Sequence, residues 1–154
     1  MDASFLTDPQ RSAWASYQRM RVRLAGQINR ELALLTGLSE ADYEILAVLA
    51  ESPDETMRAL ALRCGLEWEK SRLSHQIRRM EARGLVRREE CREDNRATII
   101  RITESGRKLA AGARLAYEQA IQRHVIGVLT PGELEMLHHI AERISTTLEP
   151  SHTP

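Results

Sequence analysis

The sequence lacks features that several classes of protein require. No apolar run in its 154 residues approaches the roughly 20 residues that span a bilayer, so no membrane-spanning helix is expected. The first residues include an acid and no apolar segment, so we expect no secretory signal and a cytoplasmic location. Two cysteines are too few for a disulfide framework or a four-ligand zinc site, so reduced thiols and no cofactor are expected.

Catalytic signatures are also missing. The sequence contains no glycine-rich phosphate loop, no paired carboxylates at a catalytic spacing and no Ser-His-Asp or Cys-His arrangement. One helical Glu-x-x-His pattern, Glu135 and His138 with His139 beside them, defines an alternative hypothesis of a helical metalloprotein. Such a site needs further ligands, and only His124 is available, so the sequence favours a protein that is not an enzyme.

The formal net charge is zero, but the charge is unevenly distributed. Residues 70–88 contain seven basic residues and one acid, so the rest of the chain has a net charge of −6. A basic stripe on an acidic body is expected of a protein that contacts phosphates with one face. A solvated, arginine-rich helix would give the same composition.

Apolar periodicity, capping residues and glycine positions predict a mainly helical chain. Ser39 and Thr130 each begin a capping box, Thr56 is expected to cap a short helix, and Cys64-Gly65 is expected to stop it. The expected elements are helices over 10–35, 39–51, 56–65, 69–83 and 103–129, strands over 85–88 and 98–102, and a last helix from residue 130.

The helix expected over 69–83 carries the most information about function. Leu73, Ile77 and Met80 share one side, which predicts the core face, and Trp68 is expected to be buried just before the helix. A short helix, a tight turn and a second helix with a donor-rich face predict a helix-turn-helix that places its second helix in the DNA major groove. The predicted DNA-binding residues of this helix are Lys70, Ser71, Arg72, Ser74, His75, Arg78 and Arg79.

The two strands predict a hairpin, or wing, with arginines at its tip. Asp94-Asn95 provides turn chemistry, and residues 98–102 are rich in β-branched side chains. An arginine on a narrow tip can enter the minor groove, and Asp94 is expected to restrain it through a side-chain pair. The predicted DNA-binding residues of the wing are Arg87, Arg92, Asp94 and Arg96.

The sequence resembles the MarR family of winged-helix transcriptional regulators. The resemblance rests on 84–88 (GLVRR), 94–96 (DNR) and 102–106 (ITESG), which are similar to the family's GLV, D-x-R and L-T-x-x-G signature. It departs from the family where Ile102 replaces leucine and where Glu69 replaces a serine-like cap. The resemblance implies an α+β winged helix-turn-helix, with Arg96 in the minor groove and the helix positions of Ser71, Arg72, His75 and Arg78 in the major groove.

The same resemblance implies a homodimeric repressor on a pseudopalindromic operator. The predicted organisation is an N-terminal dimerisation helix over 1–37, a winged helix-turn-helix over 38–103 and C-terminal dimerisation helices over 104–150. Apolar residues along one face of the last helix would be left open in a single chain, and a second copy would cover them. These residues are Leu134, Leu137, Ile140, Ile144 and Leu148.

Two questions of regulation stay open at this point. The resemblance implies a small aromatic or anionic effector, and Trp14, Tyr17 and Tyr43 are candidates for lining its pocket, although each is also a candidate core residue. Cys91 lies near Arg88 and Arg92, which favour a thiolate, and among acidic neighbours, which oppose it. A thiol-switched repressor that uses Cys91 is therefore an alternative, and Cys64 is expected to be an inert, packed thiol.

Overall fold

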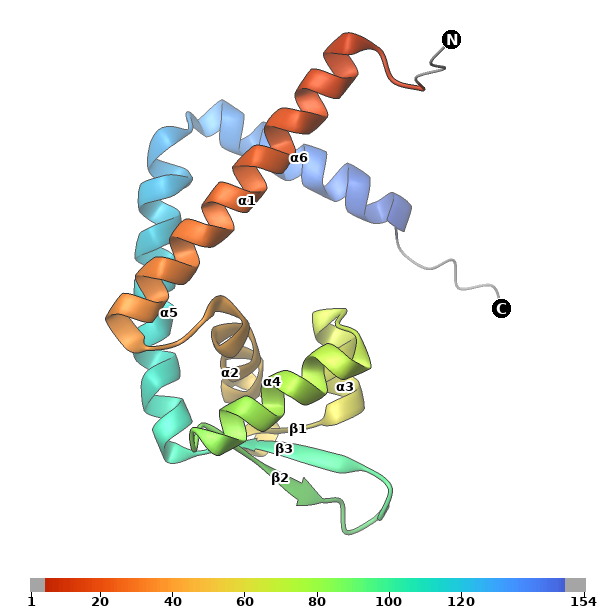
Figure 1. The fold of residues 1–154 in the computed structure, drawn as a ribbon, viewed down its shortest axis with the longest axis vertical. Helices are drawn as coiled ribbons and strands as arrows, with labels where there is room; N and C mark the ends of the chain where they lie inside the picture. Colours follow the sequence, from red (N-terminus) through yellow and green to blue (C-terminus); the bar gives the residue numbers. More distant parts are fainter. Residues whose placement is uncertain (1–4, 149–154) are drawn as a thin grey trace. The chain divides into compact units, whose positions relative to one another are not determined.

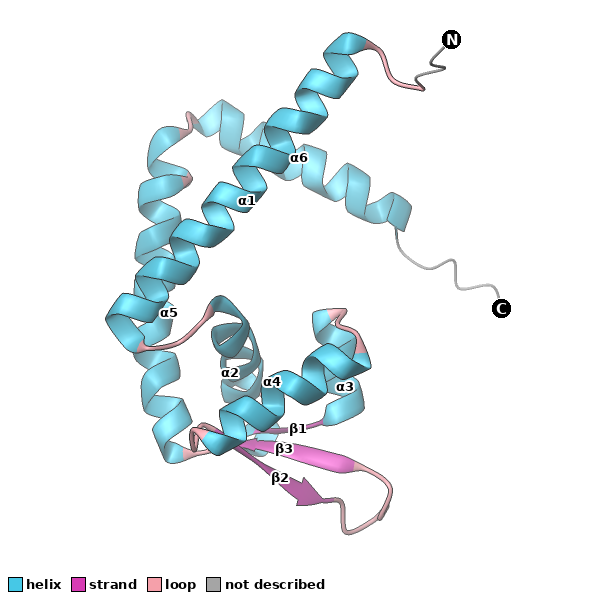
Figure 2. Cartoon of the chain, viewed as in Figure 1, coloured by secondary structure: helices cyan, strands magenta, loops and turns pink. Residues whose placement is uncertain are grey.

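The computed structural model describes residues 5–148 as a mainly helical chain with one small sheet (Figures 1 and 2). The predicted fold class, mostly α with a small β part, is confirmed. The chain forms two compact units, and the boundary between them lies between Glu118 and Gln119. None of the helices in residues 5–148 is long and apolar enough to cross a membrane. The elements are α1 (Asp8–Thr36), α2 (Glu40–Glu51), η1 (Pro53–Glu55), β1 (Thr56–Arg58), α3 (Ala59–Leu66), α4 (Lys70–Ala82), β2 (Val86–Glu90), β3 (Thr98–Ile102), α5 (Glu104–His124), η2 (Ile126–Val128) and α6 (Pro131–Leu148).

The core of the first unit lies where α2 and α4 contact the sheet. Leu46 and Leu49 on α2, Met80 on α4 and Ile100 on β3 are essentially inaccessible to solvent. Burying side chains of this size stabilises the fold by roughly 1.5 to 3 kcal/mol each. The sheet and α4 are therefore held against a common apolar centre, which fixes the wing relative to the helix.

The sheet has three strands in the order β1-β3-β2, and both strand pairs are antiparallel (Figure 2). The base of the wing pairs Val86 with Ile102, and the added strand pairs Thr56 with Arg101. The prediction that Thr56 caps a helix was therefore wrong. Thr56 belongs to β1 because it pairs with β3. The helix α3 begins only at Ala59, and the residue before it, Arg58, provides no side-chain cap.

Two predicted helix ends were also wrong. α3 continues through Gly65 to Leu66, because Glu67 adopts the left-handed conformation (φ 55°) that ends the helix. α5 ends at His124 rather than at residue 129. Val125 leaves the helical conformation there, and the backbone at Gly127 approaches the Gln122 carbonyl so closely that a Cβ would lie 2.8 Å from it.

The predicted capping residues are confirmed at several other ends. Ser39 and Asp42 form a reciprocal capping box on α2, and Thr130 forms one with Glu133 on α6. Gly84 follows α4 with φ 73°, a conformation that glycine adopts without steric strain. The predicted segments 1–37, 38–103 and 104–150 stay predictions. Residues 1–4 of the first segment and residues 149 and 150 of the last lie outside the described residues.

Candidate nucleic-acid interface

The exposed strip on α4 is the centre of the candidate interface. The predicted core face is confirmed, since Leu73, Ile77 and Met80 are buried, and Trp68 is buried with 8% of its surface exposed. Gln76, which the apolar pattern did not single out, is buried with them. All seven residues predicted to bind DNA are exposed: Lys70, Ser71, Arg72, Ser74, His75, Arg78 and Arg79.

Three of these residues form the middle of the strip. The helical period places Ser71, His75 and Arg78 opposite the buried face, on successive turns of α4. Within residues 5–148 their side chains have no hydrogen-bond or ion-pair partner. A hydroxyl, an imidazole and a guanidinium are therefore presented outward with their hydrogen-bonding groups available to a ligand.

The edge of the strip that faces α2 is held by contacts within the protein. The guanidinium carbon of Arg72 lies 3.8 Å from the centre of the Trp68 ring, a cation–π contact. Burial raises the pKa of Glu44 on α2, and the nearby charge of Arg72 opposes that rise. On the same edge, Arg79 donates a hydrogen bond to the side-chain carbonyl of Gln76. Arg72 and Arg79 are thus oriented before any ligand binds.

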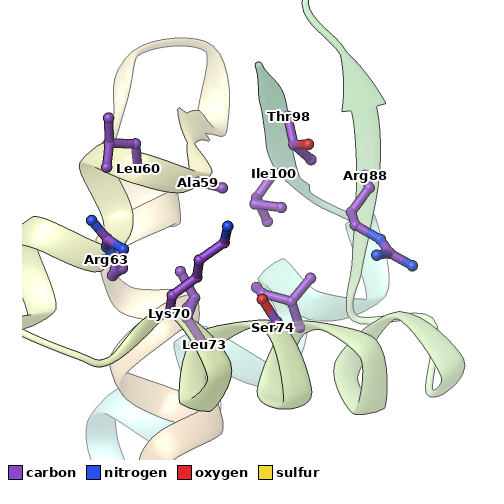
Figure 3. A pocket seen from close by; sticks show the side chains of 10 residues that line it. Ala59, Leu60, Arg63, Lys70, Leu73, Ser74, Arg88, Thr98 and Ile100 are labelled. Carbon is purple, nitrogen blue, oxygen red and sulfur yellow. The ribbon is translucent and has the colours of Figure 1, made fainter. Parts of the chain in front are cut away.

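The other edge of the strip borders a pocket between α3, α4 and the sheet (Figure 3). Its volume is about 470 Å³. Lys70 and Ser74 line it from α4, while Arg88, Thr98 and Ile100 line it from β2 and β3 (Figure 3). The strip is consequently separated from the wing by a concave surface.

Acidic partners neutralise part of the basic stripe seen in the sequence. Arg83 pairs with Asp42 at 2.7 Å and Arg87 with Glu89 at 3.0 Å. Arg88 pairs with Glu81 at 2.8 Å, and the hydrogen bond from Arg88 holds the pKa of Glu81 below its usual value. The positive charge available to a ligand is therefore smaller than the composition of residues 70–88 indicates, and Arg87 is partly committed to Glu89.

The wing tip, residues 91–97, joins β2 to β3 and carries two free arginines. Arg92 and Arg96 are exposed, and their guanidinium groups have no partner in the part of the chain that the structure describes. Asp94 Oδ1 accepts a hydrogen bond from the backbone N–H of Arg96 at 3.0 Å. The expected side-chain pair between Asp94 and Arg96 was wrong, because the carboxylate closes the turn through the backbone. The Arg96 guanidinium is left available.

The end of the wing and the start of α5 are locked together by three residues of the sequence signature. The hydroxyl of Thr103 donates to the Gly84 carbonyl at 2.6 Å and accepts from the Gly106 backbone N–H at 3.0 Å. A Cβ at Gly106 would lie 2.1 Å from the carbonyl oxygen of Leu85. Only glycine fits this contact, which gives the glycine of the L-T-x-x-G pattern a steric reason.

One of the two cysteines is placed differently from the prediction. Cys64, expected to be packed, is exposed, because on the short helix α3 it is Leu62 that points into the core. Cys91 is buried with 6% of its surface exposed, and Arg58 lies 3.8 Å from its sulfur. A redox-active thiol must be accessible to its oxidant, so the burial of Cys91 weakens the alternative of a thiol switch.

The three aromatic residues proposed for an effector pocket do not come together. Trp14 and Tyr17 contact each other on α1, with ring centres 5.3 Å apart, and both are exposed. Tyr43 contacts Tyr117 of α5 instead, at 4.9 Å. Tyr43 lines a pocket of about 420 Å³ between α2 and α5, and neither Trp14 nor Tyr17 contributes to it.

The histidines of α6 do not form a metal site with their neighbours. His139 lies 3.9 Å from Glu135, and its ring centre lies 6.0 Å from that of His138. Among residues 5–148 no three histidine, cysteine, aspartate or glutamate side chains gather closely enough to hold a metal ion. The geometry gives the metalloprotein alternative no support.

A polar cluster beneath the strip leaves almost no trace in the sequence: Asp42 and Gln76 are buried in it, and Arg83, whose side chain is 43% exposed, pairs with Asp42 from the surface. In the sequence, Asp42 stands three residues after Ser39 and indicates only the capping box, and Arg83 is only one of the seven basic residues in 70–88. The sole signal in the sequence was a glutamine among the core positions of α4, which the apolar pattern would have filled with a hydrophobic residue.

Comparison with known proteins agrees with this geometry. Residues 36–97 match the model of the MarR family. The crystal structure of AbsC, a MarR family transcriptional regulator from Streptomyces coelicolor, has 36% sequence identity and a TM-score of 0.87 over 95% of this chain and 98% of that chain. Sco3205, a MarR family transcriptional regulator from the same organism in complex with DNA, has 30% identity and a TM-score of 0.90 over 97% and 94%. The transcriptional regulator HosA of Escherichia coli is 27% identical over 113 residues, which are 73% of this chain and 82% of HosA.

Proposed function

The chain belongs to the MarR family of transcriptional regulators, and on that premise we propose that it is a homodimeric repressor that binds a pseudopalindromic operator in double-stranded DNA. The observation that carries the proposal is the row of donors in the middle of α4 that have no partner within residues 5–148, formed by Ser71, His75 and Arg78. A helix with such a face fits the major groove, where base edges present distinct patterns of donors and acceptors. The proposed function involves no catalytic step.

Two arginines of the wing extend the proposed contact. Arg92 and Arg96 project from a hairpin whose base is fixed by pairing on both sides of β3. The minor groove has the most negative potential where it narrows, and a guanidinium on a slender tip can reach it. We propose that α4 reads base edges and that the wing tip responds to the shape of the flanking DNA.

Homodimerisation is supported by apolar side chains that a single chain leaves open. On α6 the predicted apolar face is exposed along its whole length, from Leu134 at 37% to Leu148 at 75%. On α1, Trp14 and Val22 are exposed at 56% and 65%. Exposed apolar residues repeated along two helices are characteristic of a subunit interface. A two-fold dimer would present two copies of α4, which matches a two-fold symmetric operator.

An effector site belongs to the proposal as well. The pocket beside Tyr43 is also lined by Arg107 and Arg114, so it combines an aromatic wall with two cations, which pair with Glu55 at 3.0 Å and with Glu118 at 3.5 Å. Burial raises the pKa of Tyr43, so its phenol stays protonated and can donate a hydrogen bond. These groups suit a small aromatic or anionic ligand.

The proposed function predicts a dimer whose DNA affinity falls as salt rises. Sedimentation at micromolar concentration should give the mass of two chains. The logarithm of the association constant for duplex DNA should decrease linearly with the logarithm of salt concentration, by about 0.9 for each phosphate that is neutralised. A monomer, or an affinity that does not depend on salt, would contradict the proposal.

Comparing the DNA affinity of Arg96→Ala with that of Asp94→Ala tests whether the wing tip recognises the minor groove. Arg96→Ala removes only an exposed, unpartnered guanidinium, so folding stability should change by no more than about 0.5 kcal/mol. Its DNA affinity should fall several-fold, and its preference for A·T-rich flanks should disappear because the narrow minor groove is no longer read. Binding is measured on two operators that differ only in their flanks.

Asp94→Ala is the matched control for this experiment. It releases the backbone N–H of Arg96 and loosens the turn, but it keeps the guanidinium. We expect it to weaken binding while the preference for A·T-rich flanks is retained. If Arg96→Ala lost the same affinity on both operators, the minor-groove role of Arg96 would be ruled out.

A further inference from the structure

The buried polar cluster beneath α4 has a feature that packing alone does not require. Gln76 is 5% exposed and Asp42 is 1% exposed, and both lie among the apolar residues that join α2 to α4. Burying a glutamine is less favourable than burying a leucine unless its amide is fully hydrogen-bonded. Gln76 meets this condition at both ends, because its Nε2 donates to Asp42 Oδ1 at 2.6 Å and its Oε1 accepts from Arg79.

Asp42 is itself held in place from three directions. Its Oδ2 accepts from the Ser39 backbone N–H at 2.9 Å and from Arg83 Nη1 at 2.7 Å. Arg83 also donates from Nη2 to the carbonyl of Gly37, the residue that ends α1, at 2.8 Å. The carboxylate therefore ties the end of α1, the start of α2 and the end of α4 into one rigid junction, and Gln76 extends that junction to Arg79.

Arg79 lies at the edge of the exposed strip, one turn beyond His75. The middle of the strip faces base edges under the proposed function, so a side chain at its edge faces the phosphates that border the groove. A guanidinium has five donors in a fixed plane, and the bond to Gln76 occupies one of them. The remaining donors are then held in one fixed orientation before DNA arrives, which reduces the conformational entropy lost on binding.

We propose that Gln76 is a positioning residue: held by buried Asp42, it orients the Arg79 guanidinium toward a backbone phosphate and so fixes the register of α4 on the operator. The inference rests on the proposed function, since it assigns a role within the same interface. It explains why Gln76 is polar, although a buried polar side chain stabilises the core less than an apolar one and cannot contact DNA itself. It also distinguishes Arg79, which is held, from Arg78, which is free.

Arg79→Lys tests the inference without disturbing the core, because residue 79 is exposed. Lysine keeps the charge but lacks the planar fork that Gln76 can orient. We expect Arg79→Ala to lose about tenfold in affinity on operator and random duplex alike, with a salt dependence reduced by about one unit. Arg79→Lys should keep the salt dependence of the parent protein and still lose about fivefold, since a charged hydrogen bond of fixed geometry is lost. Parental affinity in Arg79→Lys would overturn the inference.

A double-mutant cycle with Gln76→Leu completes the test. Gln76→Leu should weaken binding about fivefold in the parent but cause no further loss in Arg79→Ala, because residues that act through one another are not additive. Ile77→Val, at a buried position with no polar contact, is the control and should leave affinity unchanged. Losses that add would overturn the inference, and if Gln76→Leu does not fold, Arg79→Lys decides. A parent chain that fails to bind duplex DNA would instead contradict the proposed function.

Discussion

Replacing Gly106 with alanine is expected to destabilise the fold by about 3 kcal/mol, the upper part of the usual range for overpacking. The added Cβ would lie 2.1 Å from the Leu85 carbonyl oxygen, and that atom belongs to backbone at the junction of α4 and β2. No side chain can rotate away to relieve the contact. The Thr103 cap and the start of α5 would have to shift with it, so the wing would lose its fixed base.

Gly112→Ala is the matched control for this prediction. Gly112 lies on the same helix, it is exposed, and a Cβ there would meet no atom within 4 Å. Alanine is favoured over glycine inside a helix by about 1 kcal/mol, so this variant should be slightly more stable than the parent. Chemical denaturation at one fixed protein concentration measures both variants, since dimerisation makes stability depend on concentration. Equal stabilities for the two variants would show that the close contact at Gly106 is relieved at little cost.

Arg78→Ala is expected to cause the largest loss of sequence discrimination in α4. Its guanidinium has no partner within residues 5–148 and stands in the middle of the strip. A bidentate contact between arginine and guanine contributes about 1 to 3 kcal/mol of discrimination, so preference at one base pair should fall by roughly tenfold to a hundredfold. Binding to a set of operators that carry single base-pair changes identifies that position.

Lys108→Ala serves as the control for the loss of one charge. Lys108 is exposed on α5, outside the strip, and makes only an ion pair with Glu104 at 3.3 Å. It should leave the ratio of specific to random affinity unchanged. If Arg78→Ala weakened binding equally on operator and random DNA, α4 would not be the element that reads sequence. Arg72→Ala is expected to reduce base preference too, but it also removes the contact with Trp68, so its effect combines two causes.

The helices were predicted well because their signals are local. Apolar periodicity and capping residues act within a few positions of each other, so Ser39, Gly84 and Thr130 were identified from short stretches. Strand β1 was missed because three residues carry no periodic signal of their own. Thr56 becomes part of a strand only through its pairing with Arg101, which lies far along the chain.

The candidate interface was predicted in outline for the same reason. A helical period separates exposed from buried positions, and all seven residues of α4 that were predicted from it to bind DNA are exposed. Which of them are free depends on contacts between distant elements. Arg83 pairs with Asp42 on α2, whereas the guanidinium groups of Arg78 and Arg96 have no partner within residues 5–148, and no pattern in the sequence distinguishes Arg83 from these two.

The central place of β3 in the order β1-β3-β2 divides the wing into a part whose length and register are fixed by the sheet and a part whose length is not. A slip of β3 by one residue would break its pairing with both neighbours and turn Ile100 and Ile102 out of the core. Residues 92–96 lie beyond the last backbone hydrogen bond between the two strands, which Cys91 N–H donates to the Ala97 carbonyl. Each pair of residues inserted there would lengthen the hairpin by about 3.3 Å. Under the proposed function, insertions and deletions at the tip would therefore change how far the wing reaches along the DNA, while the sheet and α4 stay as they are.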